Sequence, residues 1–233
     1  DPSCNEHYAA KAELERDELW SLMYARAAQR GFEMELQGRY VEAFESYLDA
    51  YEIRSIEQGT LAQLIQDEPN LASERPELMA RMDRIRAGHD GEALRVEARD
   101  AYGQRQYRRA CDLLDRAQLA YARADWLSAQ GVVMRLHADI LEQDLNDIDA
   151  AIDAWTAMAD LWADAGRYSE RGEAIYNRSW LQVPQQIEAA QRGFEEAAGN
   201  FARAGDDAGE GKALMQLGWS NLPNDPGDRS QPR

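Results

Sequence analysis

The chain has 233 residues, a formal net charge of −17, and 43 acidic side chains against 26 lysines and arginines. A chain of this length can bury enough surface to fold without a disulfide or a metal ion. The acidic balance argues against binding to nucleic acid or insertion into a membrane, because a basic stripe usually marks the first and about 18 consecutive apolar residues mark the second.

The composition predicts an all-α protein, since strong helix formers are abundant and no Val-, Ile- and Thr-rich run alternates with period two. The N-terminal stretch 7–36 predicts either one long helix or a cap helix followed by the first helix of a repeat. A second helix should follow with Tyr40, Ala43, Tyr47 and Ala50 on one face, because residues at i, i+3, i+7 and i+10 align on a helix. We expect that face to be buried.

The region after this helix departs from a regular repeat, because Ala43 and Ala110 are 67 residues apart. We expect the helix to continue over residues 52–66 and to break at Pro69 and Asn70. Ser73 should then cap a new helix with Pro76 in its first turn. We interpret the segment as an enlarged hairpin rather than a lost repeat, and as a possible second contact surface.

The strongest signal is an internal repeat, which appears when the chain is shifted against itself. A shift of 39 residues aligns 148–180 with 187–219, and a shift of 41 residues aligns the unit before it. The matched residues agree in kind: Trp155 with Phe194, Trp162 with Phe201, Gly131 with Gly172, Gly172 with Gly211, and Trp180 with Trp219. Each unit is predicted to be two helices, the first carrying a small residue midway along it: Gly31, Ala98, Ala138, Ser179 and Gly218. A small side chain on one helix lets a large one on its partner fill the space.

The last predicted helix, around residues 211–222, has no partner helix after it. Met215, Trp219 and Leu222 are apolar for a helix that should cap the array, so we expect contact through this end, by self-association or with a continuation of the chain. Residues 223–233 are polar and are predicted to be disordered.

The run Gly31…Gly38-x-Tyr40-x-x-Ala43-x-x-x-Tyr47-x-x-Ala50 resembles the tetratricopeptide repeat (TPR) family, and Leu217-Gly218 resembles its Leu-Gly pair. Units of about 40 residues with a Gly172-Glu173 step resemble the longer bacterial variant. The resemblance covers residues 20–222. It implies a right-handed α-solenoid of antiparallel hairpins, about nine helices with one enlarged hairpin, in a single domain over residues 1–222. The expected units are 20–66, 76–125, 126–166, 167–205 and 206–222.

A search for chemistry favours no enzyme. The three histidines have no metal-ligand spacing, no Cys-x-x-Cys exists, and no glycine-rich phosphate loop appears. The run 144–149 resembles a calcium loop but has Ile148 and Ala150 where a ligand and the turn glycine are needed. We expect it to form the turn and N-terminal cap of the next helix. No catalytic residue, cofactor or metal site is therefore predicted.

The resemblance places the first helices of successive units on the inner, concave wall. Its inward-facing positions form the candidate groove: Arg95, Arg99, Tyr102, Arg135, Asp139, Tyr176, Asn177 and Trp180. The candidate end contact is Met215, Trp219 and Leu222. The alternative is that Trp180 and Trp219 pack between units. Arg95, Arg99 and Arg135 would form a basic strip suited to an acidic or phosphorylated peptide.

These features predict a protein–protein interaction scaffold that binds a peptide or a partner helix in the groove. Two alternatives are open: a structural subunit that joins a larger complex, and the sensor repeat region of a larger regulatory protein. The start Asp1-Pro2-Ser3-Cys4 favours a mature periplasmic or secreted form over a cytoplasmic protein, or a piece of something longer. Cys4 and Cys111 would pair in an oxidising compartment and stay free thiols elsewhere.

Overall fold

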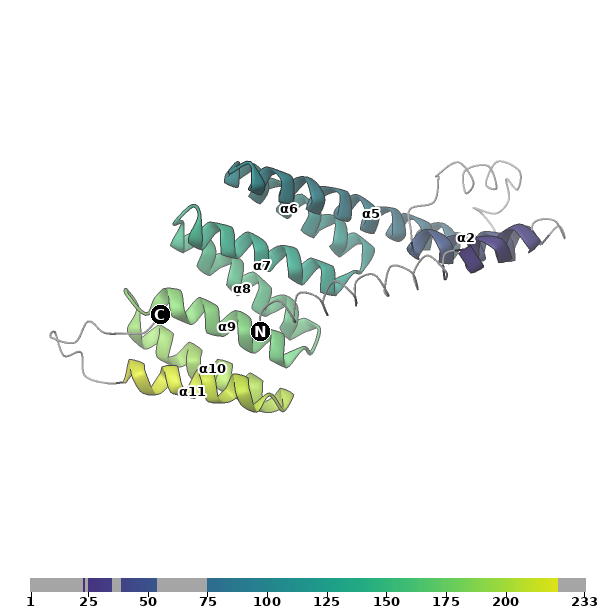
Figure 1. Ribbon diagram of the computed structural model, residues 1–233. Helices are drawn as coiled ribbons and strands as arrows, with labels where there is room; N and C mark the ends of the chain where they lie inside the picture. Colours follow the sequence, from purple (N-terminus) through teal and green to yellow (C-terminus); the bar gives the residue numbers. More distant parts are fainter. Residues whose placement is uncertain (1–22, 24, 35–38, 54–74, 222–233) are drawn as a thin grey trace, which may run out of the picture. The chain divides into compact units, whose positions relative to one another are not determined.

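The computed structural model describes residues 23, 25–34, 39–53 and 75–221, and within these ranges every regular element is a helix (Figure 1). The prediction of an all-α solenoid is thereby confirmed. The enlarged-hairpin segment 54–74 with its Ser73 cap, the tail 223–233 and Leu222 lie outside the described residues. Pro76 opens its helix as expected. Residues 25–34 are helical, and the helices after them are α2 (Tyr40–Ile53), α5 (Pro76–Gly103), α6 (Tyr107–Ala124), α7 (Leu127–Gln143), α8 (Ile148–Asp164), α9 (Tyr168–Gln182), α10 (Ile187–Ala204) and α11 (Asp207–Ser220).

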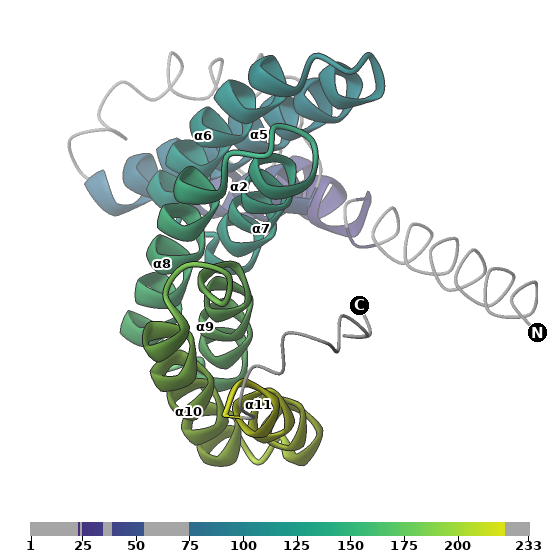
Figure 2. The same ribbon diagram turned by 90° about the vertical axis from the view of Figure 1, so that its left-hand side faces the viewer.

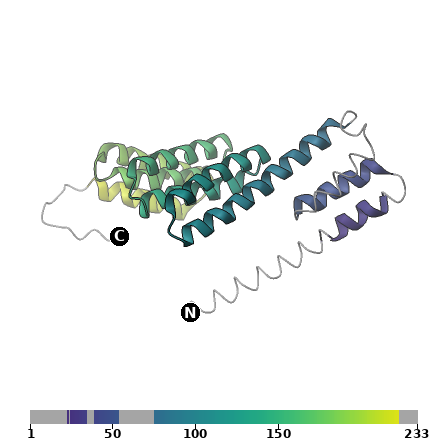
Figure 3. The same ribbon diagram turned by 90° about the horizontal axis from the view of Figure 1, so that it is seen from above.

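The chain divides into two compact units. The first comprises residues up to Asp90 with Arg123–Asp125, and the second comprises Gly91–Ala122 with the residues from Trp126 onward. Helix α5, drawn in blue to teal in Figure 3, is continuous through the division. The prediction of one repeat domain over 1–222 stays a prediction.

The first unit has a small core between α2 and the first half of α5. Tyr47 and Leu48 of α2 pack with Leu78, Met82 and Ile85 of α5. Two ion pairs join the same elements: Arg75 to Glu45 at 2.9 Å and Arg81 to Asp49 at 2.8 Å. Ala43, Tyr47 and Ala50 are all buried, as their spacing predicts.

In the second unit, consecutive helices from α7 to α11 pack against one another. Figure 2 shows α7, α9 and α11 as one layer and α6, α8 and α10 as the other. Short turns join the layers: Gly166 and Gly205 have left-handed φ angles of 67° and 71°, which glycine adopts without steric cost. The Asp147 carboxylate accepts a hydrogen bond from the Ala150 backbone N–H at 3.2 Å, so the run 144–149 is the predicted turn and cap of α8.

A glycine under an aromatic ring recurs in the hairpins of this unit. A Cβ atom on Gly131 of α7 would lie 2.0 Å from Cζ2 of Trp162 on α8. On Gly172 of α9 it would lie 3.0 Å from Cε1 of Phe201 on α10. The glycine therefore lets the large ring of the second helix lie against the backbone of the first, which explains why both residue types repeat together.

Cys111 is a free, buried thiol in the core that α5, α6, α7 and α8 share. Burial, with a smaller contribution from Asp115, raises its pKa to about 11. None of the described helices combines the length and the apolar character that crossing a membrane requires.

Candidate functional site

Helices α5, α6 and α7 of the second unit enclose a groove of about 440 Å³, called here the α5–α7 groove. Its lining is Arg95, Ala98, Arg99, Tyr102, Leu114, Leu136, Asp139, Ile140, Gln143 and Asp144. Four of the predicted groove residues thus come together: Arg95, Arg99, Tyr102 and Asp139. They meet because 95, 99 and 102 share one face of α5, and Asp139 lies on the facing stripe of α7.

Apolar side chains are exposed at this groove. Tyr102 is 46% exposed and Leu136 is 41% exposed, and Val96 and Val132 are exposed on the same two helices. Among the described residues of α6, α8 and α10, the exposed large apolar side chain is Leu119, on α6. Exposed apolar surface therefore belongs mainly to the first helix of each hairpin, which is the signature of a contact surface.

Two of the three arginines predicted to form a basic strip are already paired. Arg95 Nη2 lies 2.5 Å from Glu92, which also accepts a 2.7 Å hydrogen bond from the Tyr121 hydroxyl. Arg135 lies 3.1 Å from Glu173. Arg99 forms no ion pair with another residue in the described part of the chain, so it is the groove's available cation.

Carboxylates on the α7 side of the groove are partly withdrawn from water. Burial raises the pKa of Asp139 above its ordinary value, against a lowering by nearby Arg135. Burial also raises the pKa of Glu142, and Asp139 adds to that shift. Asp144 raises the pKa of the Tyr102 hydroxyl. A cationic group entering here would therefore meet acidic groups that solvent only partly stabilises.

The other predicted groove residues lie elsewhere. Arg135 lines a neighbouring hollow of about 240 Å³ between α7, α8 and α9. Tyr176 is buried, its ring 5.5 Å from the Phe194 ring and 4.2 Å from Nζ of Lys212. Asn177 is half-buried on α9.

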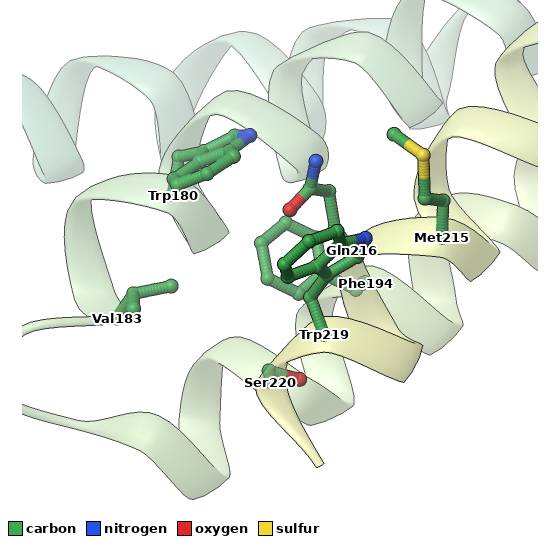
Figure 4. A pocket seen from close by; sticks show the side chains of 7 residues that line it. All are labelled: Trp180, Val183, Phe194, Met215, Gln216, Trp219 and Ser220. Carbon is green, nitrogen blue, oxygen red and sulfur yellow. The ribbon is translucent and has the colours of Figure 1, made fainter. Parts of the chain in front are cut away.

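Trp180 joins two of the predicted end-contact residues rather than the α5–α7 groove. A hollow of about 160 Å³ is lined by Trp180, Val183, Phe194, Met215, Gln216, Trp219 and Ser220. Figure 4 shows these side chains coming together from α9, α10 and α11. The Trp180 ring also packs edge-on against Phe194 at 6.1 Å, so it both lines the hollow and packs within the hairpin.

Sequence reasoning missed Leu136, Val132 and Val96. Their signal is present, because Val132 and Leu136 stand four residues apart between the polar residues Arg135 and Asp139. Within the described residues, no group of three His, Cys, Asp or Glu side chains is placed to hold a metal ion.

Comparison with known proteins identifies the family. The family model described as "SNAP: Soluble NSF attachment protein, SNAP" matches residues 65–220, which is more than half of the chain. No curated protein shows a significant match. The family match supports a helical-repeat solenoid of the non-catalytic adaptor type that binds protein partners, and does not point to tetratricopeptide repeats in particular. The chain belongs to the soluble NSF attachment protein family.

Proposed function

We propose that this adaptor binds a peptide or a helix of a partner protein in the α5–α7 groove, within repeats built in the tetratricopeptide manner. The observation that carries the proposal is the coincidence of exposed Tyr102 and Leu136 with the available cation Arg99 in one groove of about 440 Å³. Exposed apolar side chains gain about 25 cal/mol for each Å² that a partner removes from water.

The charges of the groove indicate a partner segment of mixed charge. Arg99 would receive an acidic side chain, whereas Asp139 and Asp144 would receive a basic one. A long acidic run is not favoured, because Glu92 and Glu173 already neutralise Arg95 and Arg135. The partner therefore differs from the acidic or phosphorylated peptide that the arginines alone indicate.

The description of the family supplies a first partner to test. It states attachment to NSF, so an NSF protein of the organism from which the chain comes is the first candidate. Any protein that the full chain retains from the same organism follows, provided that its affinity is then measured with purified components.

The test is a change of one apolar side chain on each face of the unit. Leu136→Glu places a charge in the groove, and Leu119→Glu places the same charge at an exposed leucine of α6 outside it. Isothermal titration calorimetry with the purified partner should give a Kd at least about tenfold weaker for Leu136→Glu, which corresponds to about 1.4 kcal/mol. Leu119→Glu should stay within about twofold of the unaltered protein.

A charge reversal sharpens the same test. Arg99→Glu should weaken binding and reduce its dependence on salt concentration, because Arg99 is the cation that the partner's acidic group would meet. Circular dichroism would establish that each variant is folded. Equal affinities for Leu136→Glu and Leu119→Glu would contradict the groove as the binding site.

A further inference from the structure

Helix α9 shows what a covered first helix looks like. Gly172, Ile175 and Ser179 share the face that α10 covers, and Ile175 is only 1% exposed. Phe201 of α10 lies over Gly172, and Ser179 lies against Gly193, where a Cβ atom would be 2.0 Å from the serine Oγ. The glycine and the serine allow the two backbones to approach closely.

Helix α11 repeats this face 39 residues later without a helix to cover it. Gly211, Leu214 and Gly218 occupy the places of Gly172, Ile175 and Ser179. All three are exposed, with Leu214 at 48%, and a Cβ atom on either glycine would meet nothing within 4 Å. On the opposite side of the helix, Ala213 is fully buried like its equivalent Ala174. The orientation of α11 is therefore that of α9, and only the covering helix is absent.

This surface, called here the α11 face (Gly211, Leu214, Met215, Gly218 and Trp219), is nearly free of charge. From Gly211 to Asn221 the one charged side chain is Lys212, whose Nζ lies over the Tyr176 ring. A face with so few charges offers little electrostatic recognition to a charged foreign helix. Residues 223–233 contain no aromatic, leucine, isoleucine, valine, methionine or alanine side chain, so they hold nothing apolar to lay over it.

The α11 face is complementary to itself. It holds two glycines that can receive a large side chain and three large side chains that can fill such a space, Leu214, Met215 and Trp219. An antiparallel pairing centred on Met215 sets residue 219 of each helix opposite residue 211 of the other. Trp219 would then lie over Gly211, as Trp162 lies over Gly131 and Phe201 over Gly172 within the chain.

We propose that the α11 face docks a second copy of this chain, with the two α11 helices antiparallel and Trp219 of each over Gly211 of the other. The contact is isologous and therefore closes as a dimer rather than growing into a filament. A helix of 14 residues is about 21 Å long, so the buried area lies at the low end for protein interfaces. The dimer should accordingly be weak, with a Kd of about 10–500 µM.

The experiment is sedimentation equilibrium of the full chain from about 5 µM to 1 mM. In about 0.5 M NaCl the repulsion between two copies of net charge −17 is screened, so the dimer should be more populated than in about 20 mM NaCl. Gly211→Gln fills the glycine space with a polar side chain and should weaken the dimer at least about tenfold. Gly199→Gln is the matched control, since Gly199 is also exposed in a helix with nothing within 4 Å of a Cβ atom, and should leave the Kd within about twofold.

Three results would overturn the proposal. The first is a monomer at every concentration up to 1 mM in high salt, and the second is a dimer that Gly211→Gln does not weaken. The third uses a synthetic peptide of Ile187–Ala204, the α10 sequence that covers α9. If the chain stays monomeric and binds this peptide, and Gly211→Gln abolishes the binding, the α11 face receives a foreign helix instead of a second copy.

Discussion

Helices α9 and α11 carry the same pattern of glycine, small and large side chains, yet one is covered on both sides and the other on one. Gly172 lies under Phe201, whereas Gly211 meets nothing within 4 Å. Ile175 is 1% exposed and its counterpart Leu214 is 48% exposed. The comparison teaches that a repeat encodes a face prepared for a partner, and that the neighbouring element determines whether the face is core or surface. Matched substitutions at covered and open positions can test this difference.

The largest expected effect is the loss of a covered aromatic ring. Trp162→Ala removes a side chain that is 5% exposed and fills the space above Gly131, so we expect the free energy of unfolding to fall by about 3–5 kcal/mol. Trp219→Ala, at 47% exposure, should cost less than about 1 kcal/mol at concentrations too low for self-association. Urea denaturation followed by circular dichroism measures both. A similar cost for the two tryptophans would show that α11 is covered in solution.

A smaller effect of opposite sign at the two sites is expected for glycine. Gly131→Ala should destabilise the fold by about 1–3 kcal/mol, because the new Cβ would lie 2.0 Å from the Trp162 ring and force it to move. Gly211→Ala should stabilise it by about 0.5–1 kcal/mol, since alanine loses less backbone freedom in a helix and meets no neighbour. Thermal unfolding of both variants beside the unaltered chain gives the two signs. Destabilisation by Gly211→Ala would mean that the glycine space is already filled.

The smallest effect concerns the partly buried carboxylate of the α5–α7 groove. Because burial raises the pKa of Asp139 above its ordinary value of 3.8, the folded state binds its proton more tightly than the unfolded state does. Its ionisation therefore lowers stability as pH rises from the unfolded pKa through the raised folded pKa. Asp139→Asn should remove this loss and raise the free energy of unfolding at pH 7 by less than about 1 kcal/mol, after allowance for solvent screening. The advantage of the variant should vanish below about pH 4, and a pH-independent difference would contradict this origin.

The sequence predicts the helix pairs well, because packing residues recur at fixed spacing. The shift of 41 residues that pairs Gly131 with Gly172 also pairs the rings of the second helices that lie over them. Asp147 is a predictable cap, since an aspartate directly before a helix can accept a hydrogen bond from a backbone N–H of the first turn. Such signals are local or periodic, so one chain is enough to read them.

Other features depend on neighbours that the repeat does not specify. Arg135 and Tyr176 hold equivalent places in successive units, yet Arg135 is exposed and Tyr176 is buried. Nζ of Lys212 lies over the Tyr176 ring, and Glu173 pairs with Arg135. The pairing of Arg95 with Glu92 likewise depends on side-chain conformation. The predicted basic strip therefore reduces to Arg99, which helix periodicity alone does not reveal.

The buried thiol of Cys111 makes the chain its own reporter of local motion. With a pKa of about 11, only about one thiol in ten thousand is ionised at pH 7, and the remainder lies within the packed core. The thiol therefore reacts with a disulfide reagent almost solely when the surrounding helices separate. Once Cys4 is replaced by serine, the ratio of its reaction rate to that of an unfolded peptide gives the free energy of that opening. The same residue thus records how often the helices beside the α5–α7 groove part, without any label being added to the surface.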